Sequence, residues 1–137
     1  MMRFIAFEVL HLYDSGKSGI SVPAQLSIGT RSVNVVTKLD TGATHCIFQR
    51  VYGDYLGLDI ESGYRQEFHT TNGTFFAYGH QITLSVLSFD FDSVVYFTAD
   101  ENFTRDVLGR HRFLDRVCIG IKDYQGELYL SRNNITP

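Results

Sequence analysis

Apolar and polar residues alternate along much of the chain, which is the pattern of β-strands with one buried face. The alternation predicts strands at Arg3–Leu10, Ile20–Ile28, Arg31–Leu39, His45–Phe48, Tyr64–Thr70, Thr74–Leu87, Phe89–Thr98, Val117–Ile121 and Glu127–Ser131. Together these segments predict a protein made mostly of β-strands.

Turn residues separate the expected strands. Gly29-Thr30 predicts a short hairpin, and Asn72-Gly73 is a strong signal for the tip of a longer one. Helical spacing over residues 49–58 predicts one or two helical turns, and a second helix-compatible segment follows Gly109. We expect the tail from Asn133 to Pro137 to fray.

The composition is that of a soluble globular protein, with 44% hydrophobic and 20% charged residues among 137. This length suits one domain spanning residues 1–137. The 11 Phe and 8 Tyr favour strands. A net charge of −3 leaves no basic footprint, so we expect no nucleic-acid partner.

The N-terminal residues do not form a signal peptide, because Glu8 interrupts their apolar run and no small-residue cleavage site follows. No apolar run is long enough to cross a bilayer, so we expect no membrane association. Cys46 and Cys118 are too few for a disulfide framework. We therefore expect a cytoplasmic protein with two buried thiols.

One short stretch, Leu39-Asp40-Thr41-Gly42-Ala43, combines an acid, a hydroxyl and a glycine at the end of an expected strand. This places a carboxylate on a tight turn where the strand leaves its sheet. We expect Gly42 to supply the backbone dihedrals of the turn and an N–H group for the carboxylate. The Thr41 hydroxyl can bond to nearby backbone. Taken alone, the tripeptide is an ordinary turn.

Three features occur in a characteristic order: Asp40–Ala43 after an apolar strand, a hairpin tipped by Asn72-Gly73, and Val107-Leu108-Gly109-Arg110 before the last two strands. In this arrangement the chain resembles the retropepsin family, the single-domain aspartic proteases of retroviruses and their bacterial and eukaryotic relatives. The resemblance covers about Ile20 to Ser131. It implies a closed, mostly antiparallel β-barrel with a flap hairpin and one short C-terminal helix.

The resemblance also implies roles for individual residues. Asp40 would be the catalytic acid, Thr41 would lock two catalytic loops together across a dimer axis, and the Gly42 amide would support the carboxylate. Gly109 and Arg110 would give structural support beneath the catalytic loop. The residues expected to bind substrate are Ala43, Thr70, Thr71, Asn72, Gly73, Thr74, Val107 and Leu108.

Peptide hydrolysis of this kind needs two carboxylates that share one proton. The sequence has one Asp-Thr-Gly, so a second copy of the chain must supply the other acid. We therefore expect a homodimer with both Asp40 side chains on its two-fold axis. Its substrate would be a peptide or protein in extended conformation, and the chemistry requires no cofactor.

Three residues, at two places along the chain, depart from the retroviral pattern. Thr44 and His45 stand where retroviral enzymes usually carry acids, one of which pairs with the arginine of the Gly-Arg element. Arg110 is expected to hold a buried ion pair, and its partner stays open. Lys38 replaces a residue that is commonly apolar.

Two alternatives remain. The first is a dimeric peptide-binding module on the same fold, without turnover. The second is a metal-dependent hydrolase on a related barrel, because similar Lys-x-Asp-Thr-Gly-Ala strings occur in candidate zinc proteases. We expect no metal site, because no two histidines form a close pair and neither cysteine belongs to a Cys-x-x-Cys. The histidines are His11, His45, His69, His80 and His111.

Overall fold

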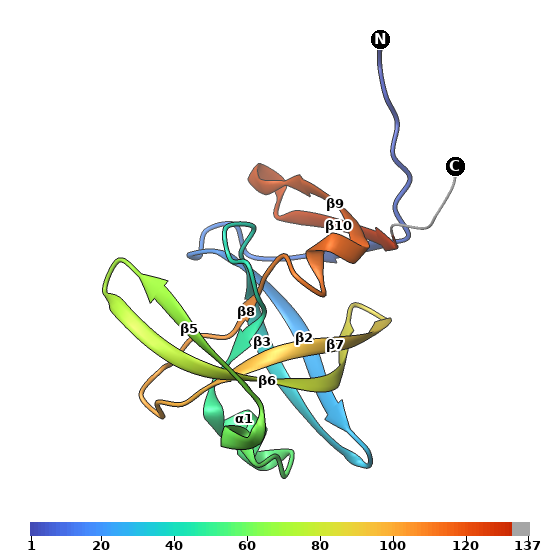
Figure 1. The fold of residues 1–137 in the computed structure, drawn as a ribbon. Helices are drawn as coiled ribbons and strands as arrows, with labels where there is room; N and C mark the ends of the chain where they lie inside the picture. Colours follow the sequence, from blue (N-terminus) through green and yellow to red (C-terminus); the bar gives the residue numbers. More distant parts are fainter. Residues whose placement is uncertain (133–137) are drawn as a thin grey trace.

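The computed structural model describes residues 1–132, and the expectation for the tail from Asn133 to Pro137 lies outside them. The chain is mostly β, as the alternation predicts (Figure 1). The strands are β1 Val9–Leu12, β2 Ile20–Ile28, β3 Arg31–Leu39, β4 Ile47–Phe48, β5 Tyr64–Thr70, β6 Gly73–Val86, β7 Phe89–Thr98, β8 Val107–Leu108, β9 Val117–Lys122 and β10 Glu127–Arg132. The helical elements are α1 Arg50–Tyr55 and three 3₁₀ turns, η1 Ile60–Ser62, η2 Leu114–Arg116 and η3 Asp123–Gln125.

Seven strands form the larger sheet, in the order β2-β3-β8-β4-β7-β6-β5. Because β2 also pairs with β6, the pairings run in a ring from β2 through β3, β8, β4, β7 and β6 back to β2. Most pairs are antiparallel, but β3–β8 and β4–β7 are parallel. Strand β5 lies outside the ring and, with β6, forms the long hairpin that projects from the molecule (Figure 1).

A separate three-stranded sheet has the order β1-β10-β9, and its strands β9 and β10 lie above the larger sheet in the view of Figure 1. Its first strand begins at Val9, so the prediction of a strand from Arg3 was wrong for the first six residues. The segment before Glu8 pairs with no strand of the described chain, and Phe4 is 84% exposed. Alternation alone cannot form a strand without a neighbour that completes its hydrogen bonds.

The main core contains apolar side chains from most strands of the larger sheet. Its largest completely buried members are Phe48, Phe97, Phe113, Leu26, Ile60, Leu84, Leu108, Leu128 and Leu130. A smaller cluster lies apart from it, built on Ile47, Ala77 and Tyr96, with Phe68, Phe75, Val94 and Phe103 packed against them. We call Phe68, Phe75, Tyr96 and Phe103 the aromatic cluster.

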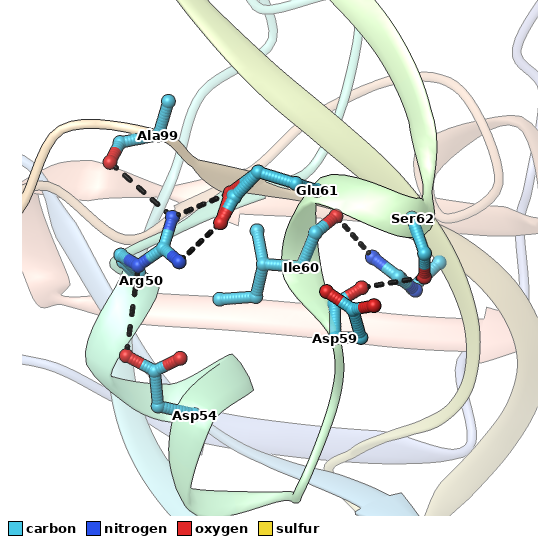
Figure 2. A network of polar contacts seen from close by, with 8 residues as sticks. Arg50, Asp54, Asp59, Ile60, Glu61, Ser62 and Ala99 are labelled. Atoms are coloured by element: carbon cyan, nitrogen blue, oxygen red, sulfur yellow. Dashed lines mark hydrogen bonds and ion pairs between the residues drawn. The ribbon is translucent and has the colours of Figure 1, made fainter.

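Helix α1 is fixed to its surroundings by Arg50 (Figure 2). The Arg50 guanidinium donates to both carboxylate oxygens of Glu61 in η1 and to the carbonyl oxygen of Ala99, 3.4 Å away. Asp54, one turn later in the helix, lies 3.7 Å from Nε of Arg50. The hydrogen bonds to Glu61 raise the pKa of Arg50 and lower that of Glu61. These contacts connect the helix to the loop after β7.

The expected helix near the C-terminus does not form among the described residues. After β8 the chain makes only the 3₁₀ turn Leu114–Arg116. Arg112 has a φ of 70°, in the left-handed region, which interrupts a right-handed helix at that residue. No helix among residues 1–132 has both the length and the apolar character to cross a membrane.

Candidate active site

The turn at Asp40 begins where β3 ends, and backbone hydrogen bonds define its shape. The Asp40 amide donates to the carbonyl oxygen of Leu108 at 3.0 Å, which continues the parallel pairing of β3 with β8. The Ala43 amide donates to the Asp40 carbonyl oxygen at 3.2 Å and closes the turn. The Gly42 amide donates to Oδ1 of Asp40 at 2.9 Å. The carboxylate is therefore oriented by the backbone two residues later.

The neighbours of Asp40 behave differently from what the motif suggested. Gly42 does not have a positive φ, so the turn does not need its conformational freedom. A Cβ there would instead lie 3.3 Å from Oδ1 of Asp40, a tight contact beside the carboxylate. Thr41 is exposed, and its hydroxyl has no hydrogen-bond partner among residues 1–132. The expected bond from Thr41 to nearby backbone does not form.

Gly109 passes directly beneath the Asp40 turn. A Cβ on Gly109 would lie 2.3 Å from the carbonyl oxygen of His45 and 2.8 Å from that of Ala43. Immediately after it, the Arg110 amide donates to the Ala43 carbonyl oxygen at 2.9 Å, and the His111 amide donates to that of Thr44 at 2.7 Å. The two segments therefore approach closely only because residue 109 has no side chain.

Cys46 completes this support from within the core. Its sulfur lies 3.3 Å from the Gly109 amide nitrogen, and the residue is completely buried. Burial raises the pKa of the Cys46 thiol to about 11. The thiol therefore stays protonated at neutral pH and is not a nucleophile.

A cavity of about 250 Å³ opens beside Asp40, between its turn and the β5–β6 hairpin. We call it the Asp40 cleft. Its residues from the turn and β4 are Asp40, Gly42, Ala43, Thr44, His45 and Ile47. The hairpin and the strand β8 with its preceding loop contribute Phe68, His69, Thr70, Phe75, Phe103, Arg105 and Val107.

Three members of the aromatic cluster, Phe68, Phe75 and Phe103, form the apolar wall of the Asp40 cleft. Phe68 and Phe75 stack with ring centroids 5.2 Å apart, and Phe75 lies 4.9 Å from Phe103. Tyr96 meets Phe68 edge-on at 5.4 Å. The cleft therefore has a carboxylate on one side and aromatic rings on the other, an arrangement suited to an amphipathic ligand.

The cleft unites five of the residues expected at the site: Asp40, Gly42, Ala43, Thr70 and Val107. The other hairpin residues Thr71, Asn72, Gly73 and Thr74 are exposed at its tip and do not line the cleft. The tip is closed by a bond from the Thr70 hydroxyl to the Gly73 carbonyl oxygen at 2.9 Å. Leu108 is completely buried in the core, so its side chain does not line the cleft either.

Several cleft residues were not predicted as site residues, among them His45, Phe68, Phe75, Phe103 and Arg105. The alternation of β5 contains a partial signal, because Phe68 and Thr70 point to the same face of the strand. Phe103 and Arg105 lie in a polar loop without periodicity, so no sequence pattern places them beside Asp40.

The structure shows the surroundings of Lys38 and Arg110, the residues concerned in the two departures from the retroviral pattern. The Lys38 ammonium donates to the Ser18 carbonyl oxygen at 2.6 Å and to the Ser21 hydroxyl at 3.1 Å, and Lys38 does not line the Asp40 cleft. The expectation of a buried ion pair at Arg110 was wrong, because Arg110 is exposed. Its contribution to the turn is the backbone bond to Ala43.

Among residues 1–132, no group of three or more His, Cys, Asp or Glu side chains is arranged to hold a metal ion.

No protein-family model matches the chain, and no curated protein matches its sequence. Solved structures do match. A retropepsin-like aspartic protease from Rickettsia conorii has 16% identity and a TM-score of 0.65, over 90% of this chain and 97% of that one. The retroviral protease-like domain of Ddi1 from Leishmania major has 18% identity and a TM-score of 0.60, over 87% and 91%.

EIAV protease, solved in complex with the inhibitor HBY-793, has 14% identity and a TM-score of 0.50, over 66% of this chain and 80% of that one. At these identities the likeness concerns the fold. The chain therefore has the fold of the retropepsin-like aspartic proteases.

Proposed function

We propose that the chain is an aspartic endopeptidase of the retropepsin type that acts as a homodimer. The observation that carries the proposal is the Asp40 carboxylate, held by the Gly42 amide at 2.9 Å beside an aromatic cleft. The fold shared with aspartic proteases supports the same conclusion. In this proposal residues 1–137 form one domain, and the ring of strand pairings is the closed barrel.

A second carboxylate has to come from another chain. Asp40 is the only acid among the described residues that line its cleft. Asp106 is close in the fold, but its carboxylate accepts hydrogen bonds from the amide and side chain of Gln49, at 3.0 and 2.8 Å. A two-fold axis near Asp40 would bring two copies of the same acid together.

The chemistry follows from such a pair. Two close carboxylates cannot both be ionised, so they hold one proton between them. The ionised carboxylate takes a proton from water, and the protonated one donates to the carbonyl oxygen of the peptide. The pair titrates as a unit, so neither acid has a pKa of its own in the dimer.

Thr41 and the hairpin have complementary roles in this proposal. Thr41 is exposed beside the acid with an unused hydroxyl, which suits a bond to the equivalent turn of a second copy. The β5–β6 hairpin would act as the flap over the peptide. Strand β5 lies at the edge of its sheet, so an extended peptide can pair with backbone that the described chain leaves free. We also propose a cytoplasmic location, as the sequence predicts.

The substitution Asp40→Asn tests the proposal. It keeps the shape of the side chain but removes the acid, so cleavage of a peptide library should fall by about 10²- to 10⁴-fold or more. The oligomeric state, measured by sedimentation, should stay that of the parent. Asp92→Asn is the matched control, because Asp92 is exposed on β7 and does not line the cleft.

The control should cleave at the parent rate. Cleavage that survives Asp40→Asn would contradict the proposal. Peptide binding without cleavage by the parent protein would identify a binding module on the same fold instead.

A further inference from the structure

Arg105 occupies a position that the proposed chemistry does not use. It lies in the loop between β7 and β8, is exposed, and lines the Asp40 cleft. It also lines a second hollow of about 470 Å³, which Asp40 lines as well. Only Asp40, Arg105 and Val107 line both hollows. A peptide that extends from one hollow into the other would therefore pass both Asp40 and Arg105.

The Arg105 guanidinium forms no ion pair within the described chain, although the carboxylates Asp40 and Asp106 line the same second hollow. Arg105 makes no hydrogen bond or ion pair with any of residues 1–132. The other cation of the second hollow, Lys38, already donates to Ser18 and Ser21. Arg50 shows what an internally used guanidinium looks like here, because it engages Glu61, Asp54 and Ala99 together. Arg105 is thus available to a ligand.

The neighbouring wall accepts a ring. Phe68, Phe75 and Phe103 face a cavity of about 250 Å³. An apolar cavity of about 150 Å³ is enough to bind benzene. The Asp40 cleft is therefore large enough for an aromatic or large aliphatic side chain, with the peptide backbone at its mouth.

We infer that Arg105 determines specificity by selecting peptides that carry a carboxylate one or two residues from an aromatic or large aliphatic side chain seated against Phe68, Phe75 and Phe103. The guanidinium fork matches a carboxylate with two parallel hydrogen bonds. An extended peptide rises about 3.3 Å per residue, so a carboxylate one or two residues away lies only about 3–7 Å along the peptide from the seated side chain, a span that the long arginine side chain can cover. The inference depends on the proposed function, since its ligand is a peptide.

The expected effect is a modest, salt-dependent preference. Because Arg105 is exposed and its charge is screened by solvent, replacing Glu by Gln in the peptide should lower kcat/KM by about fivefold to tenfold. Raising the salt concentration should reduce this ratio, because the pair is near the surface. The aromatic side chain would contribute equally to the binding of both peptides, so it would not change the ratio of their kcat/KM values.

The experiment uses matched peptides with one Phe and a Glu, Gln or Lys placed in turn at each of the two positions on either side. The parent, Arg105→Gln, Arg105→Glu and the control Arg31→Gln are compared. Arg31 is exposed at the start of β3, roughly 30 Å along the strand from Asp40. Binding is measured separately by fluorescence anisotropy with each variant placed on Asp40→Asn, so it does not require turnover.

The inference predicts a Glu preference in the parent and in Arg31→Gln, its loss in Arg105→Gln, and a preference for Lys over Gln in Arg105→Glu. Cleavage with a Glu to Gln ratio near one in the parent would overturn the role of Arg105 and leave the protease proposal standing. Glu-selective binding that depends on Arg105, without cleavage, would support Arg105 and refute the protease. If the parent neither binds nor cleaves any of these peptides, both the role of Arg105 and the protease proposal are refuted.

Discussion

His45 connects the Asp40 turn to the β5–β6 hairpin. Its Nε2 lies 3.1 Å from the side-chain nitrogen of Gln66 in β5, and its ring packs edge-on against Phe68. Because an amide nitrogen donates only, Nε2 of His45 accepts this bond and the ring is neutral. Burial, and secondarily the charge of His111, lowers the pKa of His45. Its Nδ1 is buried without a partner among the described residues.

This environment predicts that stability falls in mild acid. The unfolded histidine has a pKa of about 6.5, and the folded one is lower, so the unfolded state binds more protons between the two values. The contribution of His45 is therefore complete above about pH 6.5 and decreases as the pH falls below it. Urea unfolding between pH 5 and 8 measures this slope.

The matched pair for that measurement is His45→Gln and His69→Gln. His69 is exposed and lines the same cleft. The His45 variant should lose the part of the slope below pH 6.5 that the His69 variant keeps. Equal slopes in the parent and in His45→Gln would show that His45 titrates alike in both states.

Single residues around the acid illustrate what a motif can and cannot predict. Asp-Thr-Gly-Ala was enough to propose Asp40 and the supporting amide of Gly42, because both belong to one local turn. The direction in which the Lys38 side chain points was not predictable, since its partner Ser18 lies on another loop. Arg105 was missed for the same reason. Its place beside Asp40 results from the pairing of β8 with β3.

At the scale of elements, the contact between the Asp40 turn and the β8 segment depends on Gly109. The substitution Gly109→Ala would place a Cβ 2.3 Å from the His45 carbonyl oxygen, and all of its nearest neighbours are backbone atoms. Since backbone cannot rotate away, the free energy of unfolding should fall by about 1–3 kcal/mol or more. The urea midpoint measures the loss.

Gly16→Ala is the control for this effect. Its Cβ would meet the end of the Asp14 side chain at 3.2 Å, which can move. The unfolding free energy of the control should stay within about 0.5 kcal/mol of the parent. If alanine were tolerated equally at both positions, the close approach beneath the Asp40 turn would be disproved.

The predictability of each element follows from what stabilises it. Strands β2, β3 and β7 begin and end where alternation predicted, because each has one buried face and partners within the chain. The hairpin was equally clear from Asn72-Gly73. The prediction of the first strand was wrong before Val9, because that segment has no partner strand within the described chain. The helix expected after Gly109 failed because Arg112 takes a left-handed conformation that no sequence pattern signals.

At the scale of the whole molecule, the proposed active site depends on the assembly of two chains. One chain brings one acid to the cleft, and the exposed Thr41 beside it has no partner among residues 1–132. The strand order and the structural matches support the protease architecture, yet each match concerns a fold. The proposed activity therefore depends on the pairing of two Asp40 side chains.

Mixing the parent with Asp40→Asn tests this pairing. The two proteins are unfolded together in varying proportions, refolded, and assayed for peptide cleavage at constant total concentration. If each site needs two Asp40 side chains, activity should follow the square of the parent fraction, so an equal mixture retains about one quarter of the parent activity. Activity proportional to the parent fraction, with about one half remaining in the equal mixture, would show that each chain acts alone and would contradict the account.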